Sequence, residues 1–192
     1  MRIGLVRHFK VDMLFSEPLY TPEQINTKLT DYDSCSVIPN EVHLNGIEWE
    51  ICYSSTMPRA VITAETIFNN EIIETDLLKE VDLRAFTNKK IPLPGWLWHF
   101  GGRIAWYKEK ESQPEKYSET IARADKILDM IISSGRQNVL CVSHGFFMGV
   151  LFRKLYKLGF KGDADMRPQN GKLYVFSRQN SETSSKPPET SN

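Results

Sequence analysis

Short apolar stretches that alternate with helical patterns are the feature that most limits how this chain can fold. The apolar stretches, each predicted as a strand, are residues 1–8, 51–54, 72–75, 138–142 and 172–176. The helical patterns between them are residues 22–31, 58–68, 118–134 and 146–158. Strands that alternate with helices favour a mostly parallel sheet covered by helices on both faces. The sequence therefore predicts the α/β class, as a three-layer α/β/α sandwich.

Residues 77–102 are the least regular part of the sequence. They include five residues that favour loops: Pro92, Pro94, Gly95, Gly101 and Gly102. Ring side chains stand among them: Trp96, Trp98, His99 and Phe100. Proline and glycine predict loops here, and the rings indicate a cap that either lines a pocket or closes the core. A short helix is expected next, over residues 103–111.

The composition suits one folded domain followed by a tail. The chain has 192 residues, of which 41% are hydrophobic, enough for a single globular domain. We expect this domain to span residues 1–178. Residues 179–192 are polar, rich in serine and threonine, and offer almost nothing to bury, so this segment is predicted to be disordered.

The overall charge and the cysteines exclude several classes of function. Lysine plus arginine and aspartate plus glutamate both total 24, so the formal net charge is zero. A balanced charge predicts no binding to nucleic acid or to a membrane surface. No apolar run reaches the roughly 18 residues that a spanning helix needs, and no signal peptide precedes the first strand. Three separated cysteines without CxxC spacing favour a cytoplasmic protein. The sequence indicates no oligomeric state.

Three predicted strands end in side chains that suit an anion. Arg7 and His8 follow the first strand, Arg59 follows the second, and His144 follows the fourth. Carboxyl ends of parallel strands meet at one edge of a sheet, so these groups can converge there. Two guanidinium groups, two imidazoles and a helix N-terminus form a site for phosphate.

One imidazole of this group can also act as a nucleophile. Cations around a histidine lower its pKa and keep the ring neutral near pH 7. Phosphoryl transfer needs mainly positioning and neutralisation of charge, which arginines can supply. The sequence contains no HxH, no HExxH and no clear carboxylate cluster. We therefore expect neither a metal nor a cofactor.

Four motifs together resemble a known family. In order along the chain they are Leu5-Val-Arg-His8, Tyr53-Ser-Ser-Thr-Met-Pro-Arg59-Ala60 with Thr63-Ala64-Glu65, Leu78-Lys-Glu80, and Val142-Ser-His144-Gly145. This set resembles the histidine phosphatase superfamily, also called the phosphoglycerate-mutase-like family. The resemblance extends from Arg2 to the last strand and implies the phosphoglycerate-mutase-like fold.

The resemblance implies a role for each matching residue. His8 corresponds to the nucleophile that becomes phosphorylated, and Arg7 and Arg59 correspond to the phosphate clamp. His144 corresponds to the second imidazole, which hydrogen-bonds the transferred group. Glu80 falls where such proteins carry the general acid that protonates the leaving oxygen.

The chain departs from the family pattern directly after the nucleophile. Phe9 replaces the usual glycine, so the turn there is either ordinary in φ or strained. Leu14 stands where many members carry a phosphate-binding asparagine. Lys10 either compensates by adding a cation to the phosphate site or is a solvated loop residue. These departures concern the identity of the substrate more than the chemistry.

Other chemistries fit the sequence less well. Cys52 and Arg59 are one residue too far apart for the C-x5-R loop of cysteine phosphatases, so Cys52 is interpreted as a buried strand residue. The pair Asp31 and Asp33 resembles an aspartate-phosphatase DxD motif, but it follows a helix instead of a strand. His99 either touches substrate or packs in the cap.

The sequence thus predicts a metal-independent phosphomonoesterase that acts on a small phosphorylated metabolite through a phosphohistidine. A phosphoglycerate-type mutase is the nearest alternative, although mutases of this family are usually longer. A phospho-ligand binding module without turnover is the alternative from a different class.

Overall fold

The structure is a computed structural model that describes residues 1–13 and 17–179. Two features discussed above fall outside these ranges: Leu14, and the predicted polar tail from residue 180 onward. In the part of the chain that is described, no helix is long and apolar enough to cross a membrane.

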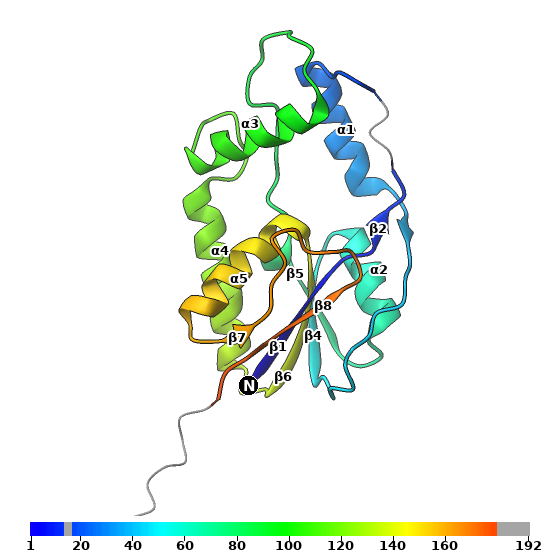
Figure 1. Cartoon of the computed structure of the whole chain (residues 1–192), viewed down its shortest axis with the longest axis vertical. Helices are drawn as coiled ribbons and strands as arrows, with labels where there is room; N and C mark the ends of the chain where they lie inside the picture. Colours follow the sequence, from blue (N-terminus) through cyan, green and yellow to red (C-terminus); the bar gives the residue numbers. More distant parts are fainter. Residues whose placement is uncertain (14–16, 180–192) are drawn as a thin grey trace, which may run out of the picture.

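A six-stranded sheet lies in the middle of the fold (Figure 1). In spatial order its strands are β5 (Ile72–Thr75), β4 (Ile51–Ser55), β6 (Asn138–Ser143), β1 (Arg2–Arg7), β8 (Leu173–Ser177) and β7 (Lys161–Gly162). The first four are parallel neighbours, whereas β8 runs antiparallel to both β1 and β7. The mostly parallel sheet is therefore confirmed, and all five predicted strands form.

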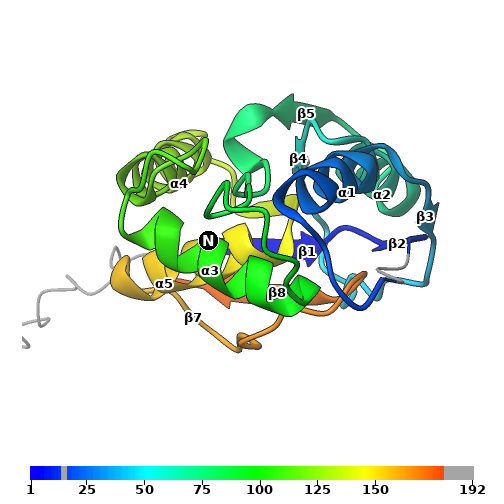
Figure 2. The same ribbon diagram turned by 90° about the horizontal axis from the view of Figure 1, so that it is seen from above.

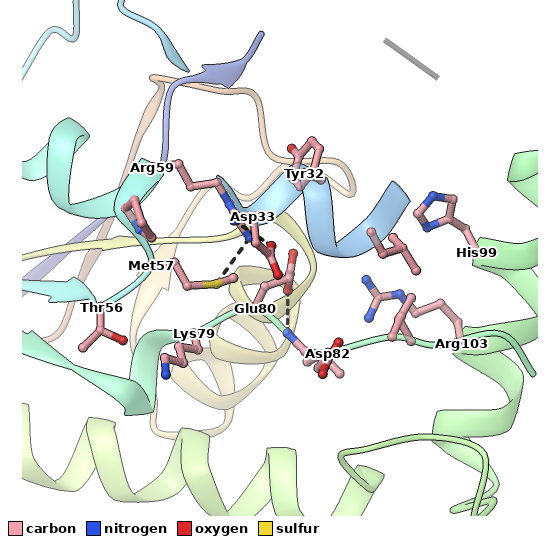
Figure 3. A pocket seen from close by; sticks show the side chains of 14 residues that line it. Tyr32, Asp33, Thr56, Met57, Arg59, Lys79, Glu80, Asp82, His99 and Arg103 are labelled. Carbon is pink, nitrogen blue, oxygen red and sulfur yellow. Dashed lines mark hydrogen bonds and ion pairs between the residues drawn. The ribbon is translucent and has the colours of Figure 1, made fainter. Parts of the chain in front are cut away.

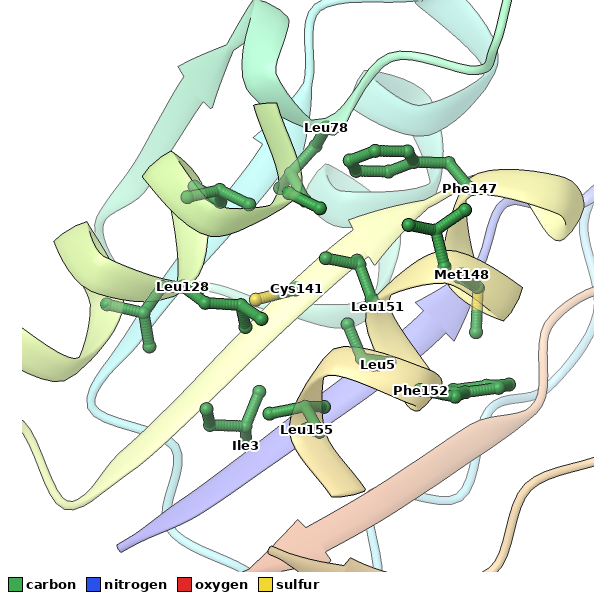
Figure 4. Packing of buried hydrophobic residues seen from close by; sticks show 14 of the residues in the cluster. Ile3, Leu5, Leu78, Leu128, Cys141, Phe147, Met148, Leu151, Phe152 and Leu155 are labelled. Atoms are coloured by element: carbon green, nitrogen blue, oxygen red, sulfur yellow. The ribbon is translucent and has the colours of Figure 1, made fainter. Parts of the chain in front are cut away.

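Helices cover both faces of this sheet, as predicted. One face is covered by α2 (Pro58–Ile67), and the other by α4 (Tyr117–Ser133) and α5 (Gly145–Lys157) (Figures 1 and 2). The predicted α/β/α sandwich is confirmed. The cluster on the α4 and α5 face is the larger of the two, and there Leu128, Leu151 and Cys141 pack together with Leu5 (Figure 4).

Side chains of the central strand β6 alternate between the two hydrophobic cores. Val139 and Cys141 belong to the core that contains α4 and α5, whereas Leu140 and Val142 belong to the core that contains α2. All four side chains are fully buried. Successive side chains of a strand point to opposite faces, so a strand covered on both sides must be apolar at every position.

A helix and a small second sheet follow β1. The helix α1 (Pro22–Ser34) begins with the predicted N-cap Thr21, and the side chains and backbone amides of Thr21 and Gln24 form a reciprocal capping box. Two short strands form the second sheet by pairing with each other: β2 (Lys10–Val11), which precedes α1 in the sequence, and β3 (Val37–Ile38), which follows it.

The loop predicted for residues 77–102 is partly wrong, because a helix, α3 (Gly95–Tyr107), occupies its last third. A 3-10 turn, η1 (Asp76–Leu78), and irregular chain precede it. Tertiary packing overrides the weak helix propensity of the glycines: a Cβ at Gly101 would collide with the ring of Phe86. The Trp98 indole N–H also donates to the Tyr20 carbonyl at 2.8 Å.

The helices α1 and α3 lie beyond the carboxyl ends of the parallel strands, at the opposite end of the molecule from Met1 (Figure 1). The view from above shows both helices over the sheet (Figure 2). They therefore enclose the edge where ligands bind in open α/β sheets.

Candidate active site

The two candidate histidines lie side by side at the carboxyl edge of the sheet. His8 follows β1, and His144 follows β6 as the N-cap of α5. Their ring centroids are 5.0 Å apart, and the two residues are 2% and 0% exposed. The neighbouring strands β1 and β6 pair Arg7 with Ser143, and the His8 N–H donates to the Ser143 carbonyl at 3.0 Å. The hydrogen bonds between these parallel strands thus hold both rings beside each other at the carboxyl edge of the sheet.

The protonation of His8 follows from its contacts. Its Nδ1 lies 2.6 Å from the Phe9 carbonyl oxygen, which can only accept a hydrogen bond. Nδ1 must therefore carry the proton, and Nε2 carries the free electron pair. Burial, followed by the charges of Arg59 and Arg7, lowers the pKa of His8 to about 3, although the Phe9 carbonyl opposes this shift. His8 is consequently a neutral ring near pH 7 with a nucleophilic Nε2.

His144 is oriented by a residue that sequence analysis did not single out. Its Nε2 lies 2.8 Å from Ser55 Oγ, and the same Oγ accepts the Met57 N–H at 3.2 Å. The serine hydroxyl can donate to Nε2, and this arrangement corresponds to the tautomer with the ring proton on Nδ1. Burial, followed by His8 and Arg59, lowers the pKa of His144 well below its ordinary value. In this tautomer the neutral ring presents Nδ1–H as a donor.

Arg7 packs against the start of α5. Its Nη1 donates to the Pro168 carbonyl at 2.8 Å. Its guanidinium lies so close to Gly145 that a Cβ there would be 2.9 Å from Nε. The glycine that follows His144 therefore makes room for this cation.

Arg59 lies in the first turn of α2 and is 2% exposed. Its Nη1 donates to Asp33 at 2.9 Å, and its guanidinium lies over the Tyr32 ring at 5.1 Å. Asp33 is half of the motif that resembled an aspartate-phosphatase signature. The structure uses it as the ion-pair partner of Arg59.

Unsatisfied donors concentrate at this edge of the sheet. Over residues 1–13 and 17–179, five buried side-chain nitrogens have no hydrogen-bond partner: Arg7 Nε, Arg59 Nε, Arg103 Nη1, His144 Nδ1 and Trp49 Nε1. Buried polar groups are nearly always paired, and an unpaired one costs free energy. Four of the five belong to cations or imidazoles around His8 and α5. An anion bound there can satisfy several of them at once.

Phe9 does not strain the turn after His8. Among the described non-glycine residues, only Asn45 and Glu109 have positive φ, so the ordinary alternative for Phe9 holds. The Phe9 N–H donates to Thr63 Oγ1 at 2.9 Å, and this hydroxyl donates to the Arg59 carbonyl at 2.7 Å. The hydroxyl of Thr63 thus links the chain after His8 to the helix that carries Arg59.

Glu80 is held at the N-terminus of α5. Its Oε2 accepts the Phe146 N–H at 3.0 Å, and its Oε1 accepts the N–H groups of Phe147 at 2.9 Å and Val81 at 3.0 Å. A carboxylate is favourable at the positive end of a helix. Both oxygens are therefore engaged, and Oε2, which accepts a single N–H, keeps a second lone pair that can carry a proton.

A cavity of about 480 Å³ is lined by Arg59 and Glu80, whereas Arg7, His8 and His144 are not among its lining residues (Figure 3). Its lining comprises Leu29, Tyr32, Asp33, Thr56, Met57, Pro58, Arg59, Lys79, Glu80, Val81, Asp82, Leu83, His99 and Arg103. His99 of α3 is thus a cavity residue, and burial, followed by Arg103, lowers its pKa. Of the tryptophans in the cap, Trp98 is buried in the core and Trp96 is 69% exposed.

Two further predictions can be compared with the structure. Cys52 is fully buried in β4, and burial raises the pKa of its thiol to about 12, so its interpretation as a strand residue is confirmed. Lys10 is exposed on β2, pairs through its backbone with Ile38, and does not line the cavity. Its role in phosphate binding stays a prediction. In the described ranges, no three His, Cys, Asp or Glu side chains are grouped to hold a metal ion.

Three residues that position this site were not identified from the sequence. Ser55 and Thr63 stood inside the quoted motif but carry no local signal of their contacts. Asn170, far along the chain, donates through Nδ2 to the His8 carbonyl at 2.7 Å. None of these contacts follows from hydrophobic periodicity, because each one joins segments distant in sequence.

Comparison with known proteins establishes the family. The family model of the histidine phosphatase superfamily (branch 1) matches residues 40–187. The match covers well over half of the chain, so the protein belongs to this superfamily. It begins after Arg7 and His8, which the structure places in and directly after the central strand β1. No curated protein matches the sequence.

Solved structures share the fold over most of their length. The alpha-ribazole phosphatase from Shigella flexneri matches with a TM-score of 0.56 and 18% identity, covering 91% of this chain and 89% of that one. The protein of open reading frame Rv3214 from Mycobacterium tuberculosis matches with a TM-score of 0.55 and 18% identity. The match covers 94% of this chain and 92% of that one. A phosphoserine phosphatase from Entamoeba histolytica, in complex with 3-phosphoglyceric acid, matches with a TM-score of 0.51 and 17% identity. The match covers 91% of this chain and 89% of that one.

The lowered pKa values of His8 and His144 predict an acid-sensitive fold. Below the ordinary histidine pKa of 6.5 these rings are protonated in the unfolded chain but stay neutral in the folded protein. For His8 this difference persists down to about pH 3. Each such ring should lower the free energy of unfolding by up to about 1.4 kcal/mol per pH unit as the pH falls below 6. Urea unfolding at pH 7, 6 and 5 measures this slope.

Substitution isolates the contribution of each ring to that slope. His8→Gln and His144→Gln should each make the pH dependence shallower than in the wild type. His43→Gln is the matched control, because His43 is an exposed histidine, and it should leave the slope unchanged. Equal slopes in all four proteins would show that the two rings are not held neutral.

The Thr63 hydroxyl predicts a specific cost for an isosteric change. Thr63→Val leaves the buried Phe9 N–H without an acceptor, which should lower the free energy of unfolding by about 1–3 kcal/mol. Thr66→Val is the matched control, since Thr66 makes the same bond to the preceding helical turn but at an exposed position. Denaturant midpoints of the two variants test the difference, and equal costs would contradict the bridging role.

Proposed function

We propose that this protein is a metal-independent phosphomonoesterase that hydrolyses a small phosphorylated metabolite through a phosphohistidine on His8. The observation that carries the proposal is the group of buried donors without partners around His8, supplied by Arg7, Arg59 and His144. A phosphoryl group has three peripheral oxygens that accept such donors. The names of the phosphatases that share the fold also support hydrolysis over a mutase reaction.

In the first step Nε2 of His8 attacks phosphorus, a P–N bond forms, and the P–O bond to the leaving alcohol breaks. Arg7, Arg59 and His144 Nδ1–H neutralise the charge on the three peripheral oxygens. Glu80 donates a proton to the leaving oxygen.

In the second step water attacks the phosphorus of the phosphohistidine. The P–N bond breaks and its electron pair returns to Nε2, while Glu80, now a carboxylate, takes a proton from the attacking water. The products are inorganic phosphate and the enzyme in its initial state. The low pKa of His8 keeps Nε2 unprotonated at the start of each turnover.

The nucleophile is tested by substitution and by trapping. His8→Ala should lower turnover of p-nitrophenyl phosphate by about three orders of magnitude or more, because the reaction loses its covalent intermediate. An alkaline quench of the wild type during turnover should retain a phosphoramidate on His8, which is stable in base and labile in acid. Peptide mass spectrometry measures the adduct.

The controls separate this mechanism from its alternatives. His43→Ala, at an exposed histidine, should keep wild-type activity, and a chelator should leave the rate intact. Wild-type turnover in His8→Ala would overturn the proposed nucleophile. Loss of activity with chelator, restored by magnesium or zinc, would overturn metal independence. No hydrolysis of any phosphomonoester, together with measurable phosphate binding, would favour a binding module.

The role of Glu80 is tested by comparing leaving groups. General acid catalysis contributes roughly 10²–10⁴-fold, so Glu80→Gln should slow phosphorylation of His8 by an alkyl phosphate by about that factor. The defect should be much smaller for a nitrophenyl ester, whose leaving group needs little protonation. Single-turnover assays isolate this step. Equal defects for both substrates would mean that Glu80 only holds the α5 N-terminus, and Asp82 would become the next candidate for the acid.

A further inference from the structure

Arg103 reaches into the cavity from the cap helix α3 (Figure 3). Arg59 enters the same cavity from α2, on the opposite side. The Arg103 guanidinium lies 3.2 Å from the centroid of the Phe146 ring at the start of α5. This contact holds a cation at the far wall of the cavity from the phosphate clamp.

Within the described residues, the guanidinium of Arg103 makes no hydrogen bond and no ion pair. Its Nη1 is buried and makes no hydrogen bond, and no carboxylate forms an ion pair with it. Burial lowers the pKa of Arg103 to about 10, against the opposing charges of Glu80 and Glu115. The group therefore remains a cation near pH 7, and its burial without a counter-ion costs free energy.

The other charged groups of the cavity are already engaged. Arg59 pairs with Asp33 at 2.9 Å, and Lys79 pairs with Asp76 at 2.9 Å. The two remaining carboxylates also have partners. Glu80 accepts backbone amides at α5, and Asp82 lies 3.4 Å from Arg84. Of the lysine and arginine side chains lining the described cavity, Arg103 alone forms no ion pair.

We propose that Arg103 binds a second anionic group of the substrate, a carboxylate or a second phosphate, while the first phosphate lies between Arg7, Arg59 and His8. This proposal rests on the proposed phosphatase function and adds the class of substrate: a phosphomonoester with two anionic ends. A guanidinium presents a planar fork that matches both carboxylate and phosphate oxygens. The cavity volume of about 480 Å³ leaves space for a small metabolite between the two arginines.

The experiment compares substrates that differ only in charge at the far end. The first pair is 3-phosphooxypropanoate and its neutral carboxamide, and the third substrate is propane-1,3-diol bisphosphate. The wild type should hydrolyse the anionic substrates with a kcat/KM roughly 10- to 100-fold higher than the carboxamide, as expected for a charge-assisted hydrogen bond. A preference for the carboxylate or for the bisphosphate then shows which anion the site takes.

Variants assign the preference to Arg103. Arg103→Gln should remove the preference by lowering kcat/KM for the anionic substrates, mainly through KM, and should leave the carboxamide close to its wild-type rate. Arg103→Lys keeps the charge and should retain part of the preference. Arg153→Gln removes an exposed arginine of α5 outside this cavity and should change neither substrate.

Failure of the second anion site and failure of the phosphatase function would give different patterns of activity. A wild type that hydrolyses the anionic substrates and the carboxamide equally well would overturn the second anion site and leave the phosphatase function standing. An equal loss on all substrates in a folded Arg103→Gln would also overturn it, because Arg103 would then act on the transferred phosphate or support α5. A wild type that hydrolyses none of them, nor p-nitrophenyl phosphate, would overturn the proposed function itself.

Discussion

The register between the parallel strands β1 and β6 is the constraint on which the rest of the site depends. It pairs Arg7 with Ser143 and continues one residue further, where the His8 N–H donates to the Ser143 carbonyl. A slip of one residue would turn every side chain of β1 to the other face of the sheet. The apolar residues on both faces of these strands prevent that slip, since each must stay in its own core. Packing of the core therefore sets the distance between His8 and His144.

Electrostatics then gives these rings their chemical character. Two buried imidazoles beside two arginines cannot easily take up protons, because each added charge would meet low dielectric and like charge. The same environment that makes the ligand-free site costly makes it favourable for a dianionic phosphoryl group. Stability and the proposed catalysis are thus opposed here: the donors without partners weaken the fold, and they are the groups proposed to bind the anion.

The cap links the phosphate edge to the rest of the cavity. Tyr32 and Asp33 of α1 contact Arg59, whereas His99 and Arg103 of α3 line the other side. In this fold the sheet provides the groups expected to act on phosphate, and the helices above it provide groups that can distinguish substrates. Loops and caps vary more easily than a sheet buried on both faces, so specificity can change there while the chemistry is kept.

The sequence by itself determined the five longer strands, most of the helices, and the polar residues at the strand ends, because hydrophobic periodicity and capping are local signals. It therefore predicted the sandwich and the meeting of Arg7, His8 and His144. Only the tertiary structure decided that Ser55 orients His144, that Asp33 pairs with Arg59, and that Glu80 binds the amides of α5. These contacts join residues 89, 26 and 66 positions apart. The first part of α3, residues 95–102, escaped prediction for the same reason: its glycines are accommodated by packing against distant side chains, which no local pattern records.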